Sequence, residues 1–195
     1  MAIQKPFLWE PDHNMGRGIK VGITGLPGAG KTQALIKVIE MLEEESLVVG
    51  GMVTEPIVES GKRVGFYVMD WKSKRKAIFA HIETESKFYV GKYGVNLESL
   101  DTVGVEALND ATKNADVIVI DEVGKMEVES EKFVKAVKDA MEVDKPIILT
   151  LHKKSRNPLL QDIRRRDDVR ILEVTPINRN LLPYKIIKLM KGEYV

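Results

Sequence analysis

Short apolar runs alternate along the chain with longer segments in which apolar residues recur every three or four positions. A short apolar run bounded by polar or glycine residues is typical of a strand that is buried in a parallel sheet. Such strands are predicted at residues 19–24, 47–53, 117–120, 146–151 and 169–174. The longer periodic segments predict helices at residues 31–45, 97–115 and 129–142, and two more in the last forty or so positions. Because strands and helices alternate, the pattern predicts an α/β fold with a mostly parallel central sheet and right-handed crossovers.

Several residues mark the ends of the predicted helices. Asn157 followed by Pro158 is a favourable pair for an N-cap and a first helical turn. Thr175, which precedes a proline, is predicted to open the final helical region, and Pro183 to start a new turn within it. Gly192 follows two lysines and is predicted to end that last helix.

The segment 54–82 departs from the alternation of strands and helices. It contains two short alternating runs, at residues 64–69 and 76–82. Ser60-Gly61 and the basic stretch 72–76 interrupt these runs, as turns would. We therefore expect antiparallel β-hairpins that are inserted beside the parallel sheet.

The ends of the chain differ in pattern from its middle. Residues 1–18 contain two prolines and no periodicity, and they are predicted to form an irregular extension. Phe7, Leu8 and Trp9 within it are expected to pack onto the domain surface. Residues 19–195 are expected to form a single domain, because 195 residues with 44% hydrophobic content can bury one sizeable core.

Composition excludes several classes of function. The chain has no cysteine, which removes disulfides, thiol catalysis and zinc–thiolate sites. His13 and His81 lack metal-ligand spacing and are expected to be structural. A formal net charge of +1 gives no global field that would gather polyanions, so any contact with nucleic acid would be local. No apolar stretch approaches about eighteen residues and no signal-peptide core is visible, so we expect a cytoplasmic protein without a membrane partner.

The glycine-rich segment between the first strand and the first helix has the pattern of a phosphate-binding loop. It consists of Gly25, Leu26, Pro27, Gly28, Ala29, Gly30, Lys31 and Thr32. Glycine is needed where the backbone N–H groups curl around a polyphosphate, and the following helix directs the positive end of its dipole at the anion. Lys31 is then expected to reach the β- and γ-phosphates, and the Thr32 hydroxyl to ligate Mg²⁺.

Two acidic residues follow the apolar run Val117-Ile118-Val119-Ile120, in the manner of a Walker B strand. Asp121 at the carboxyl end of a buried strand would project into the crevice where ligands bind, and it is predicted to hold Mg²⁺ directly or through water. Glu122 is then placed to orient and deprotonate the water that attacks the γ-phosphate. Standing alone, the acid pair would suit a solvated strand end, but the glycine loop upstream favours the catalytic interpretation.

These motifs, together with VTEP, GKRVGF, VGKYGVN and TPINR, resemble the thermostable nucleoside-triphosphatase family of P-loop proteins, including its cancer-related members, over residues 19–191. The resemblance implies a three-layer, RecA-like P-loop fold. It also implies Mg²⁺-dependent hydrolysis of nucleoside triphosphates such as ATP and GTP to diphosphates, with broad base tolerance. The residues that it assigns to nucleotide contact are residues 25–32 together with Val117, Ile118, Val119, Ile120, Asp121, Glu122, Val123 and Gly124. The extension 1–18 has no counterpart in the family pattern, and His152 stands where other members often have proline.

Other polar residues have both a functional and a structural interpretation. His152 and Thr150, at the end of one predicted strand, could sense the γ-phosphate or could be ordinary polar residues at a strand end. Lys125 and Glu127 could line the nucleotide site or begin a loop, and Asn178 could contact the base or the phosphates. One arginine could act as a finger on the transferred phosphoryl group, although a run of arginines at a helix end is more often solvated. The arginines considered for this role are Arg164, Arg165, Arg166 and Arg179.

Basic residues near an aromatic side chain suggest a possible contact with RNA, although hairpin turns are usually polar for other reasons. The set comprises residues 72–76 with Trp71, Lys153, Lys154 and Arg156. Two alternatives to a hydrolase remain open on the residues alone: a nucleotide, nucleoside or polynucleotide kinase, and a binding module switched by nucleotide. We expect a monomer or a weak oligomer, and the sequence does not specify the preferred base.

Overall fold

The structure, a computed structural model, describes residues 18–192, and within that range one sheet contains nine strands. The strands are β1 (Lys20–Gly25), β2 (Val49–Glu59), β3 (Lys62–Asp70), β4 (Lys76–His81), β5 (Tyr89–Val90), β6 (Tyr93–Val95), β7 (Val117–Val123), β8 (Ile147–His152) and β9 (Val169–Glu173). Their order across the sheet is β5-β6-β4-β3-β2-β7-β8-β1-β9. The strands from β2 to β9 in this order pair in parallel, and the remaining pairs are antiparallel. The predictions for Phe7, Leu8, Trp9 and His13 lie outside the described residues.

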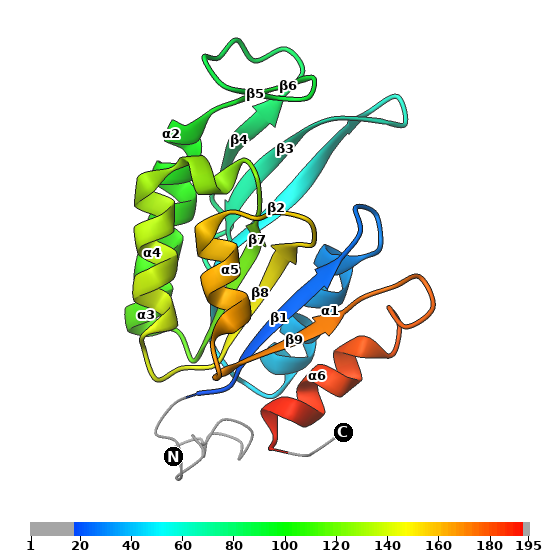
Figure 1. The fold of residues 1–195 in the computed structure, drawn as a ribbon, viewed down its shortest axis with the longest axis vertical. Helices are drawn as coiled ribbons and strands as arrows, with labels where there is room; N and C mark the ends of the chain where they lie inside the picture. The colour runs from blue at the N-terminus through cyan, green and yellow to red at the C-terminus, as the bar shows by residue number, and fades with distance from the viewer. Residues whose placement is uncertain (1–17, 193–195) are drawn as a thin grey trace.

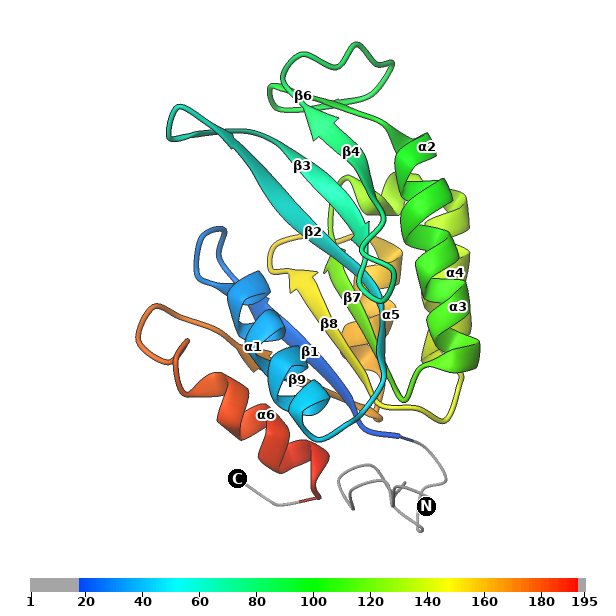
Figure 2. The same cartoon turned by 180° about the vertical axis from the view of Figure 1, so that it is seen from behind.

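Helices cover both faces of the sheet, which gives the three layers that the sequence predicts (Figure 1). The helical segments are α1 (Lys31–Glu44), α2 (Leu97–Ser99), the π-helical η2 (Leu100–Val105), α3 (Glu106–Asn114), the 3-10 helix η3 (Glu127–Glu129), α4 (Glu131–Met141), α5 (Pro158–Arg165) and α6 (Leu182–Met190). Helices α3, α4 and α5 pack on one face, and α1 and α6 lie side by side on the other (Figure 2). Asn157 caps α5 by accepting a hydrogen bond from the Leu159 N–H, as its sequence predicts.

Two hydrophobic clusters fix the central strands between these helix layers. Ile118 and Ile120 of β7 belong to the cluster under α3, α4 and α5, whereas Val117 and Val119 belong to the cluster under α1 and α6. Successive side chains of a strand point to opposite faces, so an all-apolar strand is buried on both of them. This burial holds β7 rigidly at the centre of the sheet, with the acidic residue Asp121 at its carboxyl end.

Strand β8 lies between β1 and β7, so the loops that follow these three strands emerge at one edge of the sheet (Figure 1). In a parallel sheet, ligands bind in the crevice outside the carboxyl ends of the strands. The β2–β3 hairpin extends beyond the same edge (Figures 1 and 2). The topology therefore gathers the glycine loop, the acidic residues and the hairpin around one region.

The hairpin segment differs from the sequence expectation in one respect. Strand β2 does not end at residue 53 but continues to Glu59, pairing first with β7 in parallel and then with β3 in antiparallel fashion. The antiparallel strands are thus a continuation of the central sheet, because one long strand belongs to both parts. Strands β5 and β6 were not predicted, since two or three residues are too short to produce a recognisable alternation.

The final helix also begins later than predicted. Residues 176–181 form turns, and α6 starts at Leu182. The Asn178 side chain accepts a hydrogen bond from the Thr175 N–H and donates one to the Glu173 carbonyl. These local bonds give the backbone an alternative to the helix at this point. The predicted helix end is confirmed, because α6 finishes at Met190 and Gly192 adopts a φ of 77°.

Candidate functional site

The glycine loop connects β1 directly to α1 and leaves the first turn of the helix facing the crevice. Gly28 and Gly30 have φ angles of 79° and 105°, a region of backbone conformation that favours glycine. Gly30 also occupies the N-cap position of α1 and makes no side-chain cap. The first N–H groups of α1 therefore have no partner within the helix and are available to an anion.

Lys31 connects the loop to the acidic strand. Its side chain is buried, and its ammonium donates a hydrogen bond to the Gly25 carbonyl at 3.2 Å. The same nitrogen lies 3.2 Å from the Glu122 carboxylate oxygen Oε2. The sequence-predicted lysine and the sequence-predicted base thus lie in direct contact.

Asp121 is fully buried and accepts hydrogen bonds from three threonines. The Thr32 hydroxyl donates to its carboxylate at 3.0 Å and the Thr150 hydroxyl at 2.6 Å. Thr54 donates through its hydroxyl at 3.3 Å and its backbone N–H at 3.4 Å. Burial raises the pKa of Asp121, and the Thr150 hydrogen bond opposes that rise. The donors surrounding the carboxylate favour its charged form, the form that a cation requires.

Thr54 is a site residue that the sequence reasoning missed. It follows the buried part of β2, the strand that pairs in parallel with the acidic strand β7. A polar residue directly after a buried run, next to another strand that ends in an acid, is the signal that could have identified it. That signal becomes specific only once β2 and β7 are known to be neighbours.

The acid pair lies where the β7–β8 register shifts. Ile120 pairs with Leu149 and Val123 with Leu151, so Asp121 and Glu122 together face a single residue of β8. Two residues opposite one constitute a β-bulge, which re-aims side chains next to functional sites. Here the bulge allows both acidic side chains to enter the crevice, Asp121 toward the threonines and Glu122 toward Lys31.

Two further residues place ionisable groups around Glu122. Glu127 is buried at the start of η3, and burial together with the nearby Glu122 charge raises its pKa well above the usual glutamate value. His152 ends β8 opposite Gly25 of β1, and its Nδ1 atom is buried without a hydrogen-bond partner among the described residues. Burial lowers the pKa of His152 below its usual value. Both side chains line the same cleft as Lys31 and Glu122.

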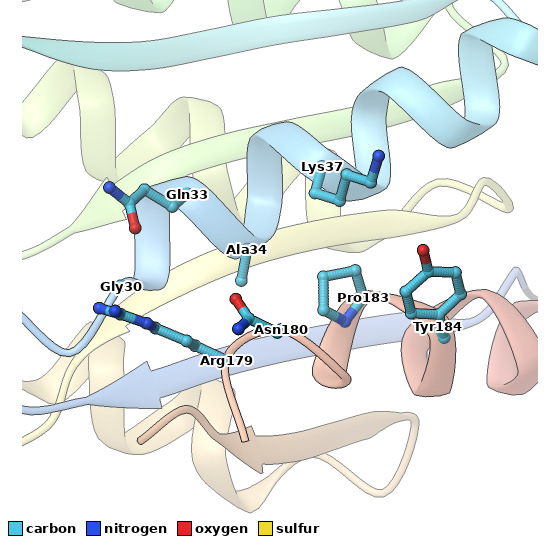
Figure 3. A pocket seen from close by; sticks show the side chains of 8 residues that line it. All are labelled: Gly30, Gln33, Ala34, Lys37, Arg179, Asn180, Pro183 and Tyr184. Atoms are coloured by element: carbon cyan, nitrogen blue, oxygen red, sulfur yellow. The ribbon is translucent and has the colours of Figure 1, made fainter. Parts of the chain in front are cut away.

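The four candidate arginines have different contacts in the structure. Arg164 donates to the carbonyls of His152, Lys153 and Ser155 and so braces the loop after β8. Arg166 is held by Asp168, Glu142 and the Met141 carbonyl, and Arg165 is an exposed residue that contacts Gln161. Arg179 lies beside Gly30 of the loop (Figure 3). Of the four arginines, Arg179 is the one that lines the loop crevice.

Several of the basic residues considered for RNA contact have partners within the chain. Lys74 lies 3.1 Å above the centroid of the Trp71 ring. Arg75 pairs with Glu106, Lys76 with Glu55 and Lys153 with Glu173. Because acidic partners offset these three positive charges, the residues do not form one continuous patch of positive charge. His81 accepts a hydrogen bond from the Glu83 N–H at its Nδ1 atom, which fits the structural role expected for it.

Two cavities meet at the loop. The larger, of about 500 Å³, is bounded on one side by the loop, Glu122, Glu127 and His152, and on the other by the β2–β3 hairpin. The smaller, of about 250 Å³, lies between α1 and the start of α6 and is shown in Figure 3. Its lining residues are Gly30, Gln33, Ala34, Lys37, Arg179, Asn180, Pro183 and Tyr184. Gly30, Gln33 and Arg179 border both cavities, so a long ligand can extend from one to the other across the loop.

The described range 18–192 contains neither a ready-made metal-ligand cluster nor a membrane-spanning helix. No cluster of three or more histidine, cysteine, aspartate or glutamate side chains arranged to hold a metal ion is present there. Within the same range, every helix is too short or too polar to cross a bilayer.

Comparisons with known proteins place the chain among nucleoside triphosphatases. A family model described as NTPase matches residues 20–187. The chain is 43% identical to the nucleoside-triphosphatase THEP1 of Picrophilus torridus over 175 residues, which is 90% of this chain and 97% of the relative. It is 42% identical, with the same coverage, to the protein of that name from Thermoplasma acidophilum.

Solved structures agree with the sequence matches. The crystal structure of THEP1 from Aquifex aeolicus is 32% identical, with a TM-score of 0.77, covering 88% of this chain and 99% of that one. The solution structure of a human cancer-related nucleoside triphosphatase is also 32% identical, with a TM-score of 0.76, covering 92% of this chain and all of that one. Sequence and fold therefore indicate the same family.

Proposed function

Since the chain belongs to the THEP1 family of nucleoside triphosphatases, we propose that it hydrolyses nucleoside triphosphates to diphosphates and phosphate in a Mg²⁺-dependent reaction with broad base tolerance. One observation carries this proposal. The pair Lys31–Glu122 and the pair Thr32–Asp121 meet at the loop that precedes α1. The first pair joins a phosphate-binding cation to a base, and the second joins two oxygen ligands of the kind that Mg²⁺ prefers.

The glycine loop itself would bind the phosphates. The N–H groups at the start of α1, with the helix dipole behind them, stabilise the negative charge of the triphosphate. The Lys31 ammonium adds a full positive charge beside the β- and γ-phosphates. Because Lys31 is buried, its interaction with phosphate is less screened by solvent than that of a surface lysine.

The residues present fit a magnesium ion. Mg²⁺ takes oxygen ligands and is usually bound by one or two carboxylates or hydroxyls together with substrate phosphates. The Thr32 hydroxyl and the Asp121 carboxylate, 3.0 Å apart, would hold it, while Thr54 and Thr150 fix the orientation of the carboxylate. When bound, Mg²⁺ neutralises charge that develops on the phosphate oxygens. Thr54 and Thr150 would thus act on the metal through Asp121 and not by direct contact.

Glu122 is the proposed general base. Its side chain is partly exposed, with 26% of its surface accessible, and it borders the cleft in which a water molecule can approach the terminal phosphate. It would accept the proton of that water as the oxygen attacks the γ-phosphorus.

The character of the smaller cavity supports the proposal of broad base tolerance. Its walls offer long polar or aromatic side chains, and Tyr184 there is 52% exposed. A site discriminates strongly between bases when buried donors and acceptors would be left unpaired by the wrong one. Stacking on Tyr184 or Arg179 is available to every base, because every base has a flat π-face.

A phosphate-release assay tests the proposal directly. Purified protein is incubated with each of the common nucleoside triphosphates, with Mg²⁺ or with excess EDTA, and with or without RNA. We expect Mg²⁺-dependent release from purine and pyrimidine nucleotides at similar rates. Release that needs no divalent cation would contradict the metal assignment, and release from one base alone would contradict the tolerance. Stimulation of tenfold or more by RNA would instead support a switch controlled by nucleotide.

A further inference from the structure

His152, at the end of β8, carries a polar atom whose hydrogen-bonding capacity the structure leaves unused. Among the residues that the structure describes, its Nδ1 atom is the single buried side-chain nitrogen or oxygen without a hydrogen-bond partner. Buried polar groups in proteins are nearly always paired, so an unpaired one calls for an explanation such as a role in catalysis. The cleft supplies that context, because His152 lines it together with Lys31 and Glu122.

The backbone of His152 is held from two sides. It pairs in register with Gly25 of β1, the first residue of the phosphate loop. Arg164 of α5 donates hydrogen bonds to the carbonyls of His152, Lys153 and Ser155, which braces the loop after β8 where it begins. The ring therefore projects from a fixed point of the sheet, as a group that must hold another side chain in place requires.

The ring points to the face of the sheet on which α1 begins. Ile148 of β8 belongs to the hydrophobic cluster under α1 and α6. Thr150 and His152 follow at alternate positions of the same strand, so their side chains share that face. Thr150 reaches Asp121 from there, and His152 lies one step nearer to Lys31, the first residue of α1.

Lys31 now occupies a place beside Glu122 that the His152 ring can take over. The Lys31 ammonium lies 3.2 Å from the Gly25 carbonyl oxygen and 3.2 Å from Glu122 Oε2. Because Gly25 is the register partner of His152, the ammonium lies between the end of β8 and the carboxylate. Burial lowers the pKa of His152, and among the charged groups Glu122 opposes that shift most strongly. The ammonium, the ring and the carboxylate are therefore close enough to exchange partners.

Nucleotide binding would draw Lys31 away from Glu122. The β- and γ-phosphates carry more negative charge than one carboxylate, and a phosphate-loop lysine is expected to contact them. Glu122 then needs another donor, because a general base must be held within hydrogen-bond reach of the proton that it removes. Its other oxygen cannot supply the link: a side-chain carbon placed on Gly124 would lie 2.6 Å from Glu122 Oε1 and 3.0 Å from Glu127 Oε2, so Oε1 faces a second carboxyl group.

We infer that His152 is a positioning residue for the proposed base: when Lys31 turns to the phosphates of a nucleotide, the Nδ1–H of His152 donates a hydrogen bond to the Glu122 carboxylate and holds it toward the attacking water. A neutral imidazole can carry its proton on Nδ1, so the ring needs no net charge for this role. The unpaired Nδ1 atom gains a partner in the same step. The inference rests on the proposed function, because it takes Glu122 as the base.

Three substitutions at position 152 test the role of Nδ1. Asparagine places an amide nitrogen near the position of Nδ1, glutamine places one near Nε2, and alanine removes both donors. We expect kcat for phosphate release from Mg²⁺-ATP to fall about 10- to 100-fold in His152→Ala and in His152→Gln, because the base is misplaced. His152→Asn should stay within about fivefold of the unsubstituted protein, and KM should change less than about threefold in all three variants, since the ring does not contact the nucleotide.

A matched control removes another histidine from the end of a strand. His81 ends β4, and its Nδ1 atom accepts a hydrogen bond from the Glu83 N–H. His81→Ala should keep kcat within about twofold of the unsubstituted value. Thermal unfolding of each variant identifies a loss that comes from misfolding. If His152→Ala fails to fold, the comparison of His152→Asn with His152→Gln still tests the inference, because both keep a polar side chain at the position.

A double-mutant cycle with Glu122→Gln separates an effect on the base from an effect on the nucleotide. Once the base is removed its orientation no longer matters, so adding His152→Ala to Glu122→Gln should lower phosphate release by less than about twofold further. The slow hydrolysis expected in this background also allows calorimetric titration with Mg²⁺-ATP and with Mg²⁺-ADP. His152→Ala should change both affinities by less than about twofold, because the ring holds the base and not the phosphates.

Each outcome decides the inference. Full kcat in His152→Ala beside an impaired Glu122→Gln would overturn it and leave the proposed hydrolytic function intact. An undiminished loss from His152→Ala in the Glu122→Gln background would show that the ring acts independently of the base. Weaker binding of ATP with unchanged binding of ADP would place the ring on the γ-phosphate, and equal losses in His152→Asn and His152→Gln would remove Nδ1 from the role; each of these results contradicts the inference. Unimpaired release by Glu122→Gln would refute the base assignment itself, and the inference with it.

Discussion

The Lys31 ammonium lies 3.2 Å from the Glu122 carboxylate, so the cation of the phosphate loop and the proposed base form an ion pair. Lys31 is buried and Glu122 has 26% of its side-chain surface exposed. A partly buried pair is screened less by solvent than a surface pair. Substitutions at either position should therefore affect both phosphate binding and proton transfer, to different degrees.

Replacing Glu122 by glutamine should separate binding from chemistry. The amide keeps the shape of the side chain but cannot accept a proton, so phosphate release should fall by about 10²–10⁴-fold. Nucleotide affinity should be retained, because the loop and Lys31 remain and a competing negative charge is gone. Calorimetric titration with Mg²⁺-ATP measures the affinity, and Glu129→Gln, which changes an exposed glutamate of η3, serves as the control. Release at the unsubstituted rate by Glu122→Gln would rule out the base assignment.

Replacing Lys31 by alanine should impair both steps. The substitution removes the positive charge next to the terminal phosphates and leaves Glu122 without its ionic partner. We expect weaker Mg²⁺-ATP binding and a loss of about 10²–10³-fold in turnover, as for other groups that stabilise transition-state charge. Lys132→Ala on the exposed side of α4 is the matched control, and binding is followed by the same calorimetric titration. Unchanged affinity in Lys31→Ala would contradict the proposed phosphate site.

Replacing Thr150 by valine should change the pH dependence of the reaction. The 2.6 Å hydrogen bond from Thr150 lowers the pKa of Asp121, so its loss raises that pKa further. Asp121 binds Mg²⁺ as the carboxylate, and the acidic limb of the activity profile should therefore move to higher pH. The measurement is phosphate release from pH 5 to pH 9 at one subsaturating Mg²⁺ concentration. Thr112→Val in α3, whose hydroxyl bonds Leu108, should leave the profile in place, and a Thr150→Val profile that coincides with it would refute the coupling.

Replacing Arg179 by alanine should weaken substrate binding without changing base preference. Its side chain borders both cavities beside Gly30, where the sugar and phosphates of a bound nucleotide would lie. We expect KM for ATP and for GTP to rise by the same factor, about ten- to a hundredfold, as for loss of a charge-assisted hydrogen bond. Arg165→Ala, which changes an exposed arginine outside both cavities, is the control. A large fall in kcat at unchanged KM would instead identify Arg179 as an arginine finger.

The pair Arg166–Asp168 should stabilise the fold in a pH-dependent way. The Arg166 hydrogen bonds hold the pKa of Asp168 below its usual value. A carboxyl group with a lowered folded-state pKa contributes stability that is fully present above its unfolded-state pKa, about 3.9, and is lost as the pH falls through the folded-state pKa. Asp168→Asn should thus lower the free energy of unfolding at pH 7 by about 1–3 kcal/mol and by less near pH 2.5.

Urea unfolding at the two pH values measures that difference. The control is Asp139→Asn, which removes an exposed helical pair with Lys135 that is worth about 0.5 kcal/mol at most. An equal destabilisation by Asp168→Asn at both pH values would show that the carboxylate charge does not contribute.

Local patterns were sufficient for much of the fold and for part of the site. The glycine loop is a contiguous segment, so its glycines, Lys31 and Thr32 are brought together by the backbone alone. Strand β7 was predictable because four successive apolar residues place apolar side chains on both faces of a strand, so both faces must be buried. Asn157 and Pro158 marked the start of α5 because capping depends on residues only a few positions apart.

The partners of these residues depended on contacts that no local pattern encodes. Thr54 and Thr150 reach Asp121 from strands that are 67 and 29 residues away in the sequence. Arg164 and Arg166 belong to one arginine run, yet Arg164 braces the loop after β8 and Arg166 joins α4 to the start of β9. Neither assignment follows from helix periodicity, because each depends on which carbonyl or carboxylate the neighbouring element presents.

The sequence by itself determined the loop, the acid pair and the alternation of strands and helices, since each depends on residues that are adjacent or regularly spaced. The tertiary structure alone decided that β8 lies between β1 and β7, that three threonines surround Asp121, and that residues of the β2–β3 hairpin line the same cavity as Glu122. The physical reason is that buried strands have similar apolar sequences, so their order is decided by packing across the whole sheet, and that order determines which side chains meet at its edge.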